Sequence, residues 1–247
     1  MFAGRTKHYF VADIHLGLKM QDEHEREAAF AGWLDAVAPD AAALYLLGDI
    51  FDFWWEYKYV VPKGYVRILG RLAQLVDAGV AVHFFKGNHD RWTFGYLEQE
   101  IGIKVYDKPR LVQIGETCFC LGHGDGGTRL WEKMFASPFL QRCFSTIHPR
   151  WGMGLGYGWS ARNRIKHNAS GILPEDVSAL YRFAELFPHR VDYFVFGHFH
   201  TPVDVQIAHQ GRFIVLGEWM PDRRYAVFDE KDKTFEVKSV TLQLNST

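Results

Sequence analysis

Cysteine is scarce in this sequence, which excludes two kinds of site. Cys118, Cys120 and Cys143 are odd in number and none belongs to a C-x-x-C pair. The sequence therefore indicates neither a disulfide framework nor a thiolate metal site. Few cysteines are typical of a reducing compartment. The start of the chain runs straight into an expected strand and lacks the apolar core of a signal peptide, so we expect a cytoplasmic protein.

Long apolar runs, repeats and an excess of one charge are also missing. No apolar run approaches the ~18 residues of a membrane span. The formal net charge of the 247-residue chain is −1, whereas nucleic-acid-binding proteins usually carry a strong positive excess, so we expect no nucleic-acid partner. Apolar residues make up 48% of the chain, enough for a sizeable core, and the length suits one domain over residues 1–247.

Short apolar runs alternate with helical patterns in the first half of the chain. The expected strands are residues 8–12, 42–47, 80–85, 117–121 and 191–196. Residues 22–37 begin with a D-x-x-E capping signal, and residues 64–78 repeat apolar side chains at helical spacing. This alternation predicts an α/β layered fold. Four shorter strands, expected to be antiparallel, follow at 205–208, 213–216, 225–228 and 234–240.

A polar motif follows each of the five expected strands. The motifs read D-I-H at 13–15, G-D-I-F-D at 48–52, G-N-H-D at 87–90, G-H-G-D at 122–125 and G-H-F-H at 197–200. Each alone has an ordinary reading as a turn or a hydrogen-bonded loop. Ligands of α/β sheets bind beyond the carboxyl ends of the strands, so five such motifs together favour one shared site.

The side chains of these motifs suit a metal centre. Asp, His and Asn supply oxygen and nitrogen donors, which Mn²⁺, Mg²⁺, Fe and Zn²⁺ accept. D-x-H and H-x-H place two donors on the same side of an extended segment. A metal pair about 3.5–4 Å apart clamps the attacking and leaving oxygens of a phosphoryl transfer and activates water. The sequence therefore predicts a metal-dependent phosphoesterase with two divalent ions, which we expect to be Mn²⁺.

The order of the five motifs resembles that of the calcineurin-like metallophosphoesterase superfamily, over residues 13–200. The resemblance implies a sandwich of two mixed β-sheets flanked by helices. It also implies a role for each motif residue: Asp13, His15, Asp49 and His200 hold one metal, Asp49, Asn88, His123 and His198 hold the other, Asp49 bridges them, His89 contacts the scissile phosphate and Asp52 orients a histidine.

Within the superfamily, the chain is most similar to the UDP-2,3-diacylglucosamine diphosphatase family. The hints are L-L-G-D-I-F-D-F-W at 46–54, its spacing to Gly87, H-G-D at 123–125 and a long insertion before Gly197. Members cleave a UDP-linked glycolipid to UMP and 2,3-diacylglucosamine 1-phosphate (lipid X) in lipid A biosynthesis. The resemblance implies transient, peripheral contact with the cytoplasmic face of the inner membrane. The family's best-known branch has Arg where this chain has His89, and another branch keeps the histidine.

Residues 126–190 interrupt the strand–helix alternation and predict a helical lid inserted into the domain. Residues 126–173 hold seven Arg or Lys, seven aromatics and one acid, a composition that suits an amphiphile bearing phosphate. We expect Arg162, Arg164 and Lys166 to meet phosphate, with solvated helix faces as the alternative. Trp54 and Tyr57 are expected substrate contacts, with core packing as the alternative. The glycines at 152, 154, 156 and 158 are expected to permit close helix packing or a hinge.

Two other functions are compatible with the motifs. A soluble phosphodiesterase or phosphatase would act on nucleotides or phosphoproteins without any need for acyl chains. A binding scaffold on the same fold, without catalysis, would often have lost Asp49 or His89, and both are present here. No pattern in the sequence indicates an oligomeric state.

Overall fold

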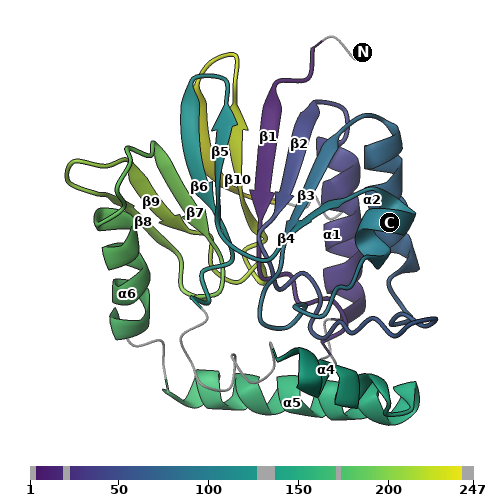
Figure 1. Cartoon of the computed structure of the whole chain (residues 1–247). Helices are drawn as coiled ribbons and strands as arrows, with labels where there is room; N and C mark the ends of the chain where they lie inside the picture. Colours follow the sequence, from purple (N-terminus) through teal and green to yellow (C-terminus); the bar gives the residue numbers. More distant parts are fainter. Residues whose placement is uncertain (1–3, 19–22, 127–136, 171–173, 241–247) are drawn as a thin grey trace.

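The fold was analysed in a computed structural model that describes residues 4–18, 23–126, 137–170 and 174–240. Within these ranges, the side chains of residues 138, 163–170 and 174–176 are not described. Two β-sheets pack face to face, and helices flank them (Figure 1). None of the helices in the described ranges is long and apolar enough to cross a lipid bilayer.

The first sheet has six strands in the order β11-β10-β1-β2-β3-β4. Their bounds are β1 (Lys7–Val11), β2 (Ala41–Leu46), β3 (Ala81–Phe85), β4 (Lys104–Tyr106), β10 (Arg224–Asp229) and β11 (Thr234–Ser239). Strands β1 to β4 are parallel, and β10 and β11 add an antiparallel edge. Helices α1 (Glu23–Val37) and α2 (Val66–Asp77) pack on the outer face, and a π-helical turn, η1 (Leu97–Ile101), precedes β4.

The second sheet has five strands in the order β5-β6-β7-β9-β8. Their bounds are β5 (Arg110–Ile114), β6 (Thr117–Leu121), β7 (Tyr193–Phe196), β8 (Val203–Gln206) and β9 (Arg212–Val215). Strands β6, β7 and β9 are parallel, and β5 and β8 pair antiparallel at the two edges. Helix α6 (Pro174–Glu185) covers the outer face of this sheet.

Strand periodicity explains the layers. On β1, Tyr9 and Val11 belong to the core beneath α1 and α2, whereas Phe10 lies between the sheets with Phe119 and Val195. Successive strand residues point to opposite faces, so a strand buried on both sides must be apolar throughout. This four-layer arrangement confirms the predicted class, an α/β sandwich of two mixed sheets flanked by helices.

The five expected strands that precede the motifs are all present, as are the two early helices. The C-terminal strands do form antiparallel pairs, but the two pairs belong to different sheets. Strands β8 and β9 join the second sheet, and β10 and β11 join the first. The pairs therefore complete both sheets, because each adds hydrogen bonds to a strand, β7 or β1, that was placed earlier in the sequence.

The described residues between β6 and β7 are mostly helical. Helices α4 (Pro138–Ser145) and α5 (Pro149–Ser170) lie across the end of both sheets to which β1 points (Figure 1). The start of the predicted insertion, residues 127–136, lies outside the described residues. Because β1, β2 and β3 run parallel, as do β6 and β7, α4 and α5 lie across the end where all five motifs emerge.

Candidate active site

Four of the motif residues adopt a backbone conformation that is unusual for anything but glycine. Asp13, His15, Asp49 and His198 have φ of +53°, +50°, +52° and +70°, in the left-handed region. Such residues cost on the order of 1 kcal/mol or more each and persist where the surroundings fix them, often at functional sites. They follow β1, β2 and β7 directly, so the chain turns sharply as it leaves each strand.

Two motif glycines allow these turns to pack together. Gly48 has φ of +86°, and a Cβ there would lie 2.5 Å from Nδ1 of His123. A Cβ on Gly87 would lie 2.2 Å from Oδ1 of Asp49. Both contacts are far inside van der Waals distance, so only glycine lets the backbone approach these side chains.

The structure brings six of the seven predicted metal ligands together as two groups, and the seventh, Asn88, contacts the second group through His123. In the first, donor atoms of Asp13, His15 and His200 lie within 4.8 Å of one another. In the second, the same holds for Asp49, His123 and His198. Asp13, His15, Asp49 and His123 are almost fully buried, whereas His198 and His200 are partly buried.

Asp49 stands between the two groups. Its Oδ2 lies 3.9 Å from Nε2 of His15 and 3.4 Å from Nε2 of His123. Its Oδ1 accepts a hydrogen bond of 2.8 Å from the backbone N–H of His89. One carboxylate therefore faces both ligand groups, which is the position that a bridging ligand requires.

The second group fits a cation better than it fits a proton. Nδ1 of His123 lies 2.9 Å from the carbonyl oxygen of Leu47, to which it donates, so Nε2 is the ring atom turned toward the site. Nε2 then lies 3.2 Å from Oδ1 of Asn88 and 3.2 Å from Nδ1 of His198, besides the Asp49 oxygen. A single N–H cannot serve three partners at once, whereas a divalent ion among them can.

The electrostatics of the buried acids also favour cations. Burial raises the pKa of Asp13 well above its usual range, against the opposing pull of His123. Burial acts in the same direction on Asp49, but His123, His89 and His15 hold the pKa of its carboxyl well below its usual range. Although burial opposes it, Asp49 and Asp13 raise the pKa of His123. Two buried carboxylates thus draw positive charge into the site, and the all-oxygen-and-nitrogen donor set suits divalent metals.

The family comparison agrees with this geometry. Residues 6–202 match the family described as calcineurin-like phosphoesterase. The chain belongs to the calcineurin-like phosphoesterase family. It is therefore a hydrolase of phosphate esters, and the family resemblance seen in the motifs is confirmed.

Two curated relatives match most of this phosphoesterase. A Porphyromonas gingivalis protein named UDP-2,3-diacylglucosamine hydrolase is 38% identical, over 91% of this chain and 95% of its own. An Edwardsiella ictaluri protein of the same name is 31% identical, over 78% of this chain and 75% of its own. Among solved structures, a dimetal phosphatase from Danio rerio aligns with a TM-score of 0.44 at 13% identity, covering 91% of this chain and 92% of its own.

His89 and Asp52 contact each other next to the two groups of predicted metal ligands. Nδ1 of His89 donates to the backbone oxygen of Asp52 over 2.8 Å. Oδ1 of Asp52 lies 3.6 Å from Nδ1 of His15. Donor atoms of His15, Asp52 and His89 also gather within 4.8 Å, but they lie on the Nδ1 side of His15, opposite its Nε2. This third group has the arrangement in which a carboxylate commonly supports a metal-bound histidine.

Two acids that the motif roles did not include hold the site in shape. The carboxylate of Asp90 accepts backbone N–H bonds from Asp49, Ile50, Phe51 and Gly87 at 2.7–3.3 Å. It therefore ties the second motif to the third, and its place at the end of G-N-H-D is a signal that could have found it. Glu218 lies 3.7 Å from Nδ1 of His200 and 3.7 Å from the buried Arg26, and no motif marks it.

The two aromatic residues predicted to contact substrate are both withdrawn from solvent, one fully and one partly. Trp54 is fully buried in the core beneath α2, and its Nε1 donates to Glu56 over 3.0 Å. The structure thus corrects its assignment to substrate binding, because apolar packing against Phe51 and Tyr65 takes its surface. Tyr57 is half-buried among residues of α4 and α5, so its contact with substrate stays a prediction.

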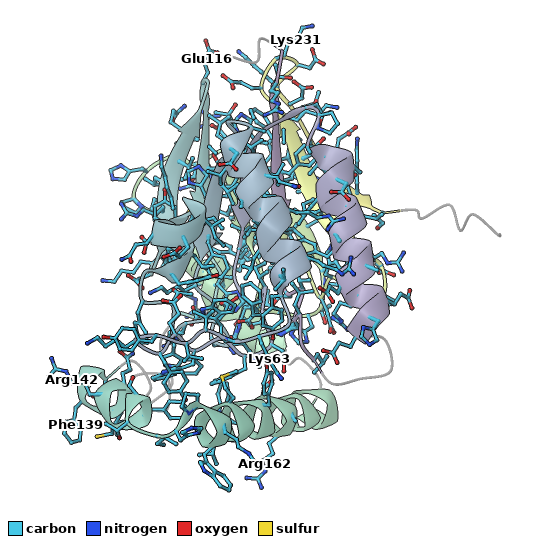
Figure 2. The ribbon with its side chains drawn as sticks, turned by 90° about the vertical axis from the view of Figure 1, so that its right-hand side faces the viewer. Lys63, Glu116, Phe139, Arg142, Arg162 and Lys231 are labelled. Carbon is cyan, nitrogen blue, oxygen red and sulfur yellow. The ribbon has the colours of Figure 1, made fainter. Side chains whose placement is uncertain are left out.

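The three basic residues expected to meet phosphate are all on α5. Arg162 is exposed and points away from the sheets, on the outer side of the helix (Figure 2). It is therefore not brought to the ligand groups, because two residues of helix turn it nearly opposite the buried Ser160. The side chains of Arg164 and Lys166 lie outside the described residues.

Proposed function

We propose that this phosphoesterase hydrolyses the diphosphate of UDP-2,3-diacylglucosamine to UMP and 2,3-diacylglucosamine 1-phosphate, a step of lipid A biosynthesis, with a pair of Mn²⁺ ions. The observation that carries the proposal is the 38% identity, across nearly the full length of both chains, to a relative named for that substrate. The two buried ligand groups around Asp49 supply the matching chemistry.

The residues divide the work of such a reaction between them. Asp13, His15, Asp49, Asn88, His123, His198 and His200 hold the metals, which when bound supply Lewis acidity toward phosphate oxygens and water. His89 has its Nδ1 committed to Asp52, so its Nε2 is the atom available to a phosphate or a leaving oxygen. There it stabilises developing negative charge or donates a proton.

A cleft beside the site, lined mostly by apolar residues and also by Glu23, Glu27, Lys63 and Arg150, suits an acyl chain. Its volume is about 570 Å³, and it lies between α5 and the loop that precedes α2. Its wall includes Leu16, Val60, Pro62, Met153 and Tyr157. Leu16 directly follows the ligand His15, so a substrate held at the metals can place a hydrocarbon chain in this cleft. A small soluble ester would leave this surface unused.

The outer face of α4 and α5 suits a membrane that carries anionic lipid. Phe139, Trp151 and Leu155 are 72%, 68% and 60% exposed, and Arg142 and Arg162 project from the same helices (Figure 2). Residues 138–170 contain no Asp or Glu. Apolar side chains flanked by basic ones are typical of helices that lie in a membrane interface. This face is the surface through which we propose that the chain, whose described helices do not span a bilayer, reaches a lipid substrate.

A double substitution on α5 tests this membrane face. Trp151→Ser with Leu155→Ser should lower binding to vesicles of phosphatidylcholine and phosphatidylglycerol by on the order of tenfold or more, because the interface no longer buries these two side chains. Sedimentation with vesicles measures the bound fraction. Val205→Ser, at an exposed position on β8, is the matched control. Equal binding by the double variant and the unchanged chain would show that α5 does not contact the membrane.

The substrate is tested by UMP release. We expect the Mn²⁺-loaded chain to release UMP from UDP-2,3-diacylglucosamine in detergent, and to stop when a chelator is added. The same chain is assayed with bis(p-nitrophenyl) phosphate, a soluble diester. Strong turnover of the soluble diester with none of the lipid would contradict the substrate while leaving the phosphoesterase chemistry intact, and would favour the soluble phosphodiesterase function.

A further inference from the structure

Three small residues on one face of α5 bring this helix against the core. Gly152, Gly156 and Ser160 are spaced four apart and therefore share a face. A Cβ on Gly152 would lie 2.0 Å from the hydroxyl of Tyr57, and one on Gly156 would lie 2.2 Å from the ring of Phe53. Gly154 and Gly158 face open space. Close packing is thus the role of two of the four glycines.

Ser160 is the member of this row that carries a polar group, and it is fully buried. Its Oγ lies 2.8 Å from Oδ2 of Asp52 and 3.2 Å from Nδ1 of His89. A hydroxyl has one proton to donate and can also accept. The consistent arrangement is that Ser160 donates to the Asp52 carboxylate and accepts from the His89 N–H, which it shares with the backbone oxygen of Asp52.

This arrangement fixes the imidazole of His89 from one side. With Nδ1 as donor, the neutral ring must carry its lone pair on Nε2, and the charged ring must present its second N–H there. Trp159, the neighbour of Ser160 on α5, packs its ring 5.5 Å from that of His89. Helix α5 thus contributes both a hydrogen bond and a packing surface to His89, although Trp159 and Ser160 lie more than 60 residues after His89 in the sequence.

We propose that Ser160 is a positioning residue for His89, and that the seating of α5 on Phe53 and Tyr57 sets the orientation of the imidazole toward the phosphate. The inference deepens the proposed function and rests on phosphoester hydrolysis, without depending on the lipid. The insertion is then part of the catalytic machinery as well as a cover for substrate. Substrates of any size would need α5 in place for full turnover.

Ser160→Ala tests the hydrogen bond directly. With a soluble alkyl phosphodiester, whose leaving group needs a proton, we expect kcat to fall about tenfold while KM and bound metal stay within twofold, because a free imidazole samples unproductive orientations. Ser160→Thr, which keeps the hydroxyl, should restore most of the loss. A rise in KM with unchanged kcat would instead make Ser160 a substrate contact and overturn the proposal.

A double-mutant cycle separates positioning from simple packing. In a His89→Asn background, Ser160→Ala should have no further effect on kcat, because the group that it positions is gone. An equal tenfold loss in both backgrounds would show that Ser160 acts independently of His89, which contradicts the inference. These assays use a soluble diester. Failure to cleave the lipid would therefore contradict the proposed substrate and would leave the result of this cycle unchanged.

The glycine row provides an independent test. Gly156→Ala forces α5 away from the buried Phe53 and should lower kcat at least as much as Ser160→Ala, with no additional loss when the two are combined. Gly154→Ala, two residues away on the same helix, meets nothing within 4 Å and should leave kcat unchanged. Circular dichroism of both variants confirms folding. Equal activity of the folded Gly156→Ala variant and the unchanged chain would overturn the link between α5 and His89.

Discussion

Asp49→Asn is expected to lower turnover by about three orders of magnitude or more, with little change in fold. The substitution keeps the shape of the side chain and leaves Oδ1 able to accept the N–H of His89. It removes the negative charge whose oxygen lies 3.4 Å from His123 and 3.9 Å from His15. The bridge between the two ligand groups is therefore weakened, and a two-metal clamp no longer forms.

Metal analysis gives that prediction a readout besides activity. The Asp49→Asn chain should retain fewer Mn²⁺ ions after dialysis than the unchanged chain, as measured by elemental analysis. The matched control is Asp35→Asn, at an exposed position on α1 where the carboxylate pairs with Arg71 over 2.9 Å; exposed pairs contribute little to stability. A variant that keeps two ions and turns over within tenfold of the unchanged chain would remove Asp49 from the bridging position.

His89→Asn should lower kcat by about 10²–10⁴-fold with bound metal unchanged, because general acid–base and charge-stabilising groups contribute in that range. Asparagine can still donate to the backbone oxygen of Asp52 from the place of Nδ1, but nothing remains at the place of Nε2. The substitution therefore removes the reacting atom and keeps the local hydrogen bond. His209→Asn, at an exposed turn position, is the control.

Leaving groups distinguish the two roles open to His89. If the imidazole protonates the leaving oxygen, the loss in His89→Asn should be largest for an alkyl phosphodiester and small for a p-nitrophenyl ester, whose leaving group needs no proton. If the imidazole only stabilises charge on phosphate, the losses should be similar. A variant that keeps full activity toward both esters would contradict any role for His89 in the reaction.

The metal centre could be predicted from the sequence because its information is local. Each ligand directly follows an apolar strand, and strand ends converge in a layered α/β fold whatever the details of packing. Asp13 and His200 thus meet in one group, and Asn88 meets His123 in the other, although these residues lie far apart in the chain. The positive φ values of the ligand turns carry no such signal, because an Asp or His in the sequence does not reveal a left-handed backbone.

The residues around the metals depend on tertiary packing and could not be placed in this way. Trp54 looked like a contact because it follows a ligand motif, but the direction of one turn decides whether it faces the cleft or the core. Arg162 looked suited to phosphate, yet the helical phase of α5 turns Ser160 inward in its place. Glu218 reaches His200 from a segment that has no motif. The direction in which a helix or turn presents each side chain depends on the packing of the whole fold, and the local sequence pattern does not determine it.

We propose that the carboxylate of Asp49 would join two metal ions in this site. The most direct test is electron paramagnetic resonance of the metal-free chain titrated with Mn²⁺. We expect two equivalents to bind and their signal to be that of an exchange-coupled pair, since both ligand groups share Asp49. A single equivalent, or two ions that give only the six-line spectrum of isolated Mn²⁺, would contradict it.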